Sequence, residues 1–235
     1  MYLGNMLSKL PRVGTTIFTR MSALAQEVGA LNLSQGFPDF EPPAKLAEAL
    51  GQHACSGNNQ YAPMAGLPRL REAVAEQLRR WRSVEVDPET EITIVPGATE
   101  GIFCAITATV NPGDEVIVLD PVYDSYEPAV ELAGGRCVHV PLNIEDFSID
   151  WDRVRAAITS RTRLLMLNSP HNPSGAVITG TDLDELENLV DEHGLYVCSD
   201  EVYEHLVFDD ATHHSVLERT SLHQMTCEYS YSHNL

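Results

Sequence analysis

Short apolar runs recur along the chain from about residue 90 and alternate with amphipathic stretches. The runs are continuously apolar, which is typical of strands covered on both faces. Alternation of strands and helices with short connections predicts a mostly parallel sheet in a three-layer α/β sandwich. The predicted strands are Glu91–Val95, Glu115–Asp120, Cys137–Leu142, Arg163–Asn168 and Leu195–Asp200. The predicted helices are Thr16–Val28, Ala44–Ala54, Pro68–Arg82, Thr99–Val110, Ser125–Ala133, Asp150–Ile158 and Thr181–His193.

The first 44 residues differ from the rest, because glycine and proline interrupt most of them. The stretch Leu31–Pro43 carries too many helix breakers for a helix and is expected to form an extended arm. A chain of 235 residues is long enough for one large domain or for one domain with a fragment. We therefore expect an arm over 1–44, followed by a large domain that begins at residue 45.

The charge balance narrows the range of partners. There are 34 acidic and 15 basic residues, which gives a formal net charge of −19. Because no basic stripe is available for phosphates, a nucleic-acid partner is not expected. The five cysteines are widely spaced without a C-x-x-C pair, so neither disulfides nor a metal site is expected. No run reaches membrane-spanning length and no signal peptide is evident, so a cytoplasmic location is expected.

Candidate chemistry follows the strands, because ligands bind beyond the carboxyl ends of parallel strands. After the first predicted strand comes Pro-Gly-Ala-Thr-Glu-Gly, in which Gly97, Ala98 and Thr99 open a helix. Free amide groups and the positive end of the helix dipole would favour a phosphate there. The alternative is an ordinary helix start.

Two further turns carry aromatic and amide groups. Tyr123 follows the second predicted strand and could stack on a flat ring, or it could pack on the rim. Asn172 lies in a turn with two prolines, one of them possibly cis, and could donate to a ring oxygen or simply serve the turn. His171 beside it is either a rim group or a solvated loop histidine.

The last predicted strand ends at Asp200. A carboxylate after an apolar run is partly desolvated and needs a cationic partner, for which a protonated pyridine nitrogen is suited. Tyr203 could reach the same ligand. The alternative is that Asp200 caps a helix beginning at Glu201.

Six segments in this order resemble class I aminotransferases of fold type I, and most closely the methionine and kynurenine aminotransferase branch. They extend over about Leu31 to Leu217. The segments are LNLSQGFPDF (31–40), NQYAPMAGLPRLREA (59–73), PGATEG (96–101), DPVYDSYEPA (120–129), NSPHNPSG (168–175) and SDEVYEHLVFD (199–209).

The resemblance implies pyridoxal 5′-phosphate as cofactor, amino acids and 2-oxo acids as substrates, and a homodimer. It implies that Gly97, Ala98 and Thr99 hold the cofactor phosphate. Tyr123 would stack on the ring, Asn172 and Tyr203 would bind its phenolic oxygen, and Asp200 would pair with its nitrogen. Gly36 would line the substrate carboxylate site, and Tyr61 would reach the phosphate in the other subunit.

The family's Schiff-base lysine has no counterpart in these residues. The only lysines are Lys9 and Lys45, which match no catalytic position, and the resemblance ends at about Leu222. The resemblance therefore implies a large domain over 45–222 and an atypical tail over 223–235. We therefore expect an incomplete large domain without the C-terminal small domain, a frameshift or premature end, and negligible transaminase activity of this chain alone. Two alternatives stay open, a non-catalytic cofactor-binding or dimerising remnant and a C–S β-lyase of the same fold. A nucleotide-dependent oxidoreductase fits poorly, because the dinucleotide fingerprint is lacking.

Overall fold

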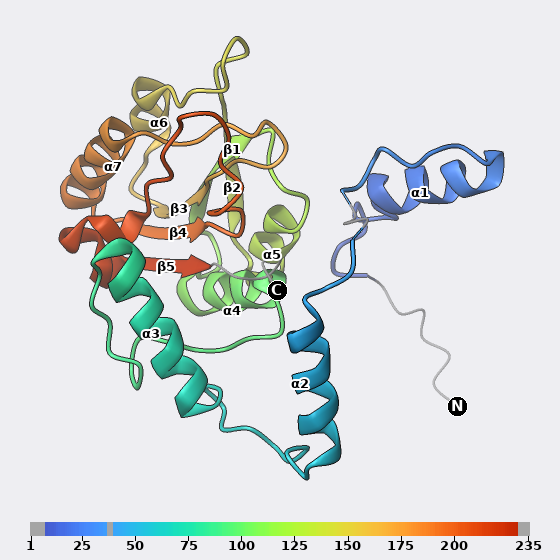
Figure 1. The fold of residues 1–235 in the computed structure, drawn as a ribbon. Coiled ribbons are helices and arrows are strands. Elements are labelled where there is room, and N and C mark those ends of the chain that lie inside the picture. The colour runs from blue at the N-terminus through green and yellow to red at the C-terminus, as the bar shows by residue number, and fades with distance from the viewer. Residues whose placement is uncertain (1–7, 37–39, 230–235) are drawn as a thin grey trace, which may run out of the picture. The chain divides into compact units, whose positions relative to one another are not determined.

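The computed structural model describes residues 8–36 and 40–229 (Figure 1). The chain divides into two compact units, Met1–Ala62 and Pro63–Leu235. The first contains α1 (Ile17–Val28) and α2 (Ala44–Cys55), as the sequence predicts. Thr16 caps α1, since its hydroxyl accepts from the Thr19 amide at 3.3 Å. Neither helix contributes a buried residue.

The second unit is built on a five-stranded parallel sheet with the order β2-β1-β3-β4-β5. Four strands follow the prediction closely, with bounds shifted by one residue or fewer. The strands are β1 (Glu115–Asp120), β2 (Arg136–Pro141), β3 (Thr162–Asn168), β4 (Tyr196–Asp200) and β5 (Thr226–Tyr229).

Helices cover both faces of this sheet (Figure 1). Ile106 of α4 and Val130 of α5 pack with Val118 of β1 on one face. Val154 of α6 and Leu186 of α7 pack with inward-facing residues of the same strands on the other. This confirms the predicted three-layer α/β fold. The helices are α3 (Pro68–Arg82), α4 (Ala98–Thr109), α5 (Tyr126–Ala133), α6 (Trp151–Ala157), α7 (Gly180–His193) and the 3₁₀ turns η1 (Val216–Glu218) and η2 (Thr220–Met225).

The predicted strand Glu91–Val95 is wrong. The segment from Ile92 to Val95 is extended but pairs with no strand among the described residues. Its Ile94 amide instead donates to the Ala65 carbonyl at 3.0 Å. An apolar run becomes a strand only where a neighbour supplies a hydrogen-bonding ladder.

Two sheet edges also differ from expectation. Strand β2 was expected to be covered on both faces, but it is an edge strand and most of its residues are exposed or half-buried. Part of the expected tail forms β5, which extends the sheet beside β4, while residues 230–235 lie outside the described range. No helix in the described part of the chain is long and apolar enough to cross a membrane.

Candidate functional site

The register of the sheet brings the candidate residues together at the carboxyl ends of the strands. Asn168 at the end of β3 lies opposite Asp200 at the end of β4. Since all strands run parallel, the turns that follow β1, β3 and β4 leave the sheet on the same side. The helix start at Gly97, which follows the extended segment 92–95, provides a further element.

The N-terminus of α4 has the geometry of an anion site. Gly97 is the N-cap, with a φ of 98° that residues other than glycine rarely adopt. No side chain caps the helix, and the space beside Gly97 is open to at least 4 Å. The first-turn amides of Ala98 and Thr99 have no partner within the helix, so they can donate to an anion.

Asp200 is the buried charge of the site. Its side chain belongs to a residue only 5% exposed, and the Tyr126 hydroxyl donates to Oδ2 at 2.6 Å. The Val202 amide donates to Oδ1 at 3.2 Å. The segment after Asp200 forms turns, so Asp200 does not cap a helix beginning at Glu201. The prediction of a desolvated carboxylate is confirmed.

The Asn168 side chain forms hydrogen bonds with both Asp200 and Asn172. Its side-chain amide donates to the Asp200 carbonyl at 2.8 Å, and its Oδ1 accepts from the Asn172 amide at 2.7 Å. The Ser169–Pro170 and Asn172–Pro173 peptide bonds are cis, which confirms the expectation of a cis proline in this turn. These two bonds hold the backbone of the half-buried Asn172 next to the carboxyl end of β4.

The Tyr123 ring meets Tyr126 edge to face, with ring centroids 5.7 Å apart and planes at 65°. Burial is the main reason why the pKa of Tyr123 is raised, and the charge of Asp124 adds to it. Tyr203 and Asp200 raise it further, so these groups share one electrostatic environment. The pKa of Tyr126 is raised strongly by burial and by the adjacent Asp200.

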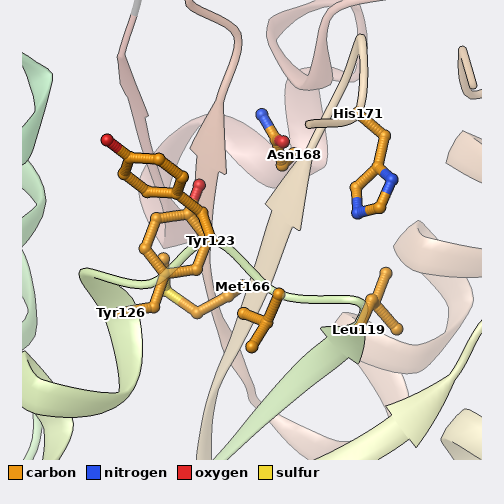
Figure 2. Close-up of a pocket in the computed structure, with 7 residues that line it drawn as sticks. Leu119, Tyr123, Tyr126, Met166, Asn168 and His171 are labelled. Carbon is orange, nitrogen blue, oxygen red and sulfur yellow. The ribbon is translucent and has the colours of Figure 1, made fainter. Parts of the chain in front are cut away.

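His171 is buried, since only 8% of the residue is exposed, so the interpretation as a solvated loop histidine is wrong. Its Nε2 lies 3.0 Å from the Pro121 carbonyl and its Nδ1 2.7 Å from the Ser174 hydroxyl. Burial lowers the pKa of His171 below its usual value, while the bond to Pro121 opposes this. Figure 2 shows both tyrosine rings on one side of the strand end that carries Asn168, and His171 on the other. The pocket in this view is lined by Leu119, Val122, Tyr123, Tyr126, Met166, Asn168 and His171.

The remaining predicted residues belong to the first unit. Gly36 follows α1 in an irregular segment, and Tyr61 is fully exposed. Residues 37–39 of the LNLSQGFPDF motif lie outside the described range.

Tyr126 and Asn168 were quoted within motifs but given no role. The signal that could have identified them is their position. Tyr126 lies three residues after Tyr123, and Asn168 lies at the end of a predicted strand.

Comparison with known proteins agrees with this arrangement. A model of the family described as aminotransferase class I and II matches residues 28–235, a range that includes the expected tail. Methionine aminotransferase from Escherichia coli is 49% identical over 217 residues, which cover 92% of this chain and 56% of that protein. Probable N-succinyldiaminopimelate aminotransferase from Mycobacterium tuberculosis is 48% identical over 209 residues, 88% of this chain and 53% of that protein.

Solved structures give the same result. The crystal structure of YbdL from Escherichia coli, reported to have a methionine aminotransferase function, superposes with a TM-score of 0.92 at 48% identity. The match covers 96% of this chain and 59% of that one. The chain thus spans about half the length of the curated relatives named above.

Proposed function

Because the chain belongs to the aminotransferase class I and II family, we propose that its strand-end face binds pyridoxal 5′-phosphate in a protein that transfers amino groups from amino acids to 2-oxo acids. Class I aminotransferases depend on this cofactor. When bound, it withdraws electrons from the amino-acid Cα. In the proposed organisation, residues 1–44 form an arm at the substrate site and residues 45–222 supply the cofactor domain.

The single observation that carries the proposal is the buried Asp200 carboxylate. A buried carboxylate is costly unless it is well paired, and a protonated pyridine nitrogen is a suitable cationic partner beside the Tyr126 and Val202 donors. Other groups at the same strand ends suit the remaining parts of the cofactor. Asn172 and Tyr203 can donate to a ring oxygen, and Tyr123 offers an aromatic face. The uncapped helix start at Gly97, Ala98 and Thr99 suits a phosphate.

The chain's own residues would bind and orient the cofactor in distinct ways. Asp200 would hold a proton on the ring nitrogen, and the Tyr126 hydroxyl would keep that carboxylate charged and oriented. Tyr123 would exclude water from one face of the ring. In the complete protein, proposed to be a homodimer, Gly36 would line the substrate carboxylate site and Tyr61 would serve the phosphate of the other subunit.

The substrate is proposed to be a methionine-like or aromatic amino acid. Support comes from the Escherichia coli methionine aminotransferase and from rat kynurenine–oxoglutarate transaminase 1, which is 35% identical over 222 residues. The Mycobacterium tuberculosis relative, named for a different substrate, is equally similar at 48% identity. A panel of amino donors tested on a complete relative of this chain would therefore decide the substrate.

We also propose that these 235 residues alone bind the cofactor without transaminating. The two lysines, Lys9 and Lys45, both lie exposed in the first unit. No lysine is present among the strand-end turns to anchor the cofactor covalently or to move the substrate Cα proton.

The first prediction tests both statements on the purified 235-residue chain. Absorbance titration should show reversible cofactor binding, and Asp200→Asn should weaken it about tenfold or more because a charged contact is lost. Borohydride treatment followed by denaturation should leave no cofactor on the chain, and methionine with a 2-oxo acid should not turn over. A folded chain that fails to bind would contradict the cofactor face. Robust turnover would contradict the proposed inactivity.

A further inference from the structure

His171 stands between the two turns that carry Tyr123 and Asn172. It directly precedes Asn172, and its ring reaches 50 positions back along the chain to the carbonyl of Pro121, two residues before Tyr123. The ring is buried, although it belongs to a turn and to no hydrophobic cluster. Such a residue needs both ring nitrogens paired, and both are.

The hydrogen-bond pattern assigns one tautomer to this histidine. The Pro121 carbonyl can only accept, so Nε2 carries the hydrogen and donates at 3.0 Å. The Ser174 hydroxyl accepts from the Ala176 amide at 3.2 Å and can give its own hydrogen to Nδ1 at 2.7 Å. Burial, which lowers the pKa of His171, favours this neutral form, and the two hydrogen bonds fix the orientation of the ring.

The same residue lines two pockets. Leu119, Asn168 and His171 line both the pocket in Figure 2 and a neighbouring cavity of about 200 Å³. Leu142, Phe147 and Ile178 also line that cavity. Loss of the imidazole would remove a wall residue from both spaces and release the turn at Pro121 from the turn at Asn172.

We propose that His171 is a positioning residue, which sets the spacing between the aromatic face of Tyr123 and the amide of Asn172 by tying the Pro121 carbonyl to the turn 168–175. The inference rests on the proposed function, since it names how that cofactor site is held in shape. His171 acts through these two residues. A displacement of about 1 Å at such a site is enough to lower function markedly.

The test uses three variants of the 235-residue chain and one control. His171→Leu removes both hydrogen bonds at similar volume, His171→Gln keeps an amide donor for the Pro121 carbonyl, and Ser174→Ala removes the partner of Nδ1. His193→Leu, at the C-terminal end of α7, is the matched control for loss of a histidine. Cofactor affinity and the induced circular dichroism of bound pyridoxal phosphate are measured for each, together with the unfolding midpoint.

We expect His171→Leu to weaken cofactor binding about tenfold and to reduce the induced dichroism per bound cofactor. His171→Gln should stay within about threefold of the parent, Ser174→Ala should lie between them, and His193→Leu should not change either readout. Unchanged affinity and dichroism in a folded His171→Leu chain would overturn the proposal. A fall in the unfolding midpoint alone, with both cofactor readouts retained, would also overturn it and leave His171 a packing residue.

A measurement without cofactor separates this inference from the proposed function. Amide hydrogen exchange of the cofactor-free chain should become faster over 121–126 in His171→Leu and stay unchanged in α7. If the parent chain is folded but binds no cofactor, the proposed function fails, while the exchange result still tests whether His171 holds the turn at Pro121. If exchange over 121–126 is unaffected by His171→Leu, His171 does not hold that turn, whether or not the cofactor binds.

Discussion

The Tyr126 hydroxyl supports the role proposed for Asp200. Tyr126 is 2% exposed, and its OH is committed to Asp200 at 2.6 Å. The ring also meets Tyr123 edge to face. One side chain thus orients the carboxylate and supports the aromatic face that the proposal assigns to the cofactor ring.

Replacing Tyr126 with Phe should therefore affect binding and stability together. The shape is kept, but the buried carboxylate loses a donor, so the free energy of unfolding should fall by about 1–3 kcal/mol. Cofactor affinity should fall about three- to tenfold. Urea unfolding and absorbance titration measure the two effects. Tyr196→Phe, at the opposite end of β4, is the control, and equal behaviour of the two variants would rule out a role for the Tyr126 hydroxyl.

At the scale of elements, Glu115 fastens the amino end of β1 to its neighbours. Its side chain is 1% exposed, and Arg136 of β2 donates to it at 2.6 Å. Thr159 and Arg161, just before β3, donate at 2.7 and 3.0 Å. The Thr159 hydroxyl, followed by the two guanidinium groups, lowers the pKa of Glu115 to about 2.

Glu115→Gln should destabilise the chain in a pH-dependent manner. The pKa is lower in the folded chain than the ordinary 4.5, so the stabilisation is complete above about 4.5 and is lost as the pH falls toward 2. At neutral pH the variant should lose about 1–3 kcal/mol of unfolding free energy. Urea unfolding at several pH values checks this. If the stability difference between the parent chain and Glu115→Gln does not decrease in acid, this prediction is contradicted. Glu76 forms an exposed ion pair with Arg79, so the control Glu76→Gln should change the stability little.

At the scale of the whole molecule, the two units are unequal. The buried hydrophobic residues of the described chain begin at Leu78, so the core lies entirely in the unit Pro63–Leu235. Apart from Tyr61, which is proposed to serve the phosphate of the other subunit, the residues assigned to the cofactor ring and its phosphate, from Gly97 to Tyr203, lie in the same unit. Stability and the proposed binding should therefore reside there together.

A variant that begins at Pro63 should test this division. It should change the free energy of unfolding by less than about 1 kcal/mol, because no buried core is removed. It should also keep the cofactor affinity that the 235-residue chain has as a monomer, in which Tyr61 has no other subunit to serve. Tryptophan fluorescence in urea is a suitable readout, since Trp81 and Trp151 both remain. A large loss of stability would show that the first unit takes part in folding the second.

The sequence by itself determined the α/β class, most element bounds and the order of chemical groups at the strand ends. These follow from local periodicity and from residues such as Asp200, whose apolar strand predicts its burial. Tertiary structure alone decided that Glu91–Val95 pairs with no described strand and that β2 is an edge. It also joined Tyr126 to Asp200 across 74 positions and His171 to Pro121 across 50. Periodicity reports which face of an element is covered, whereas a partner distant in sequence is chosen only when the whole sheet assembles.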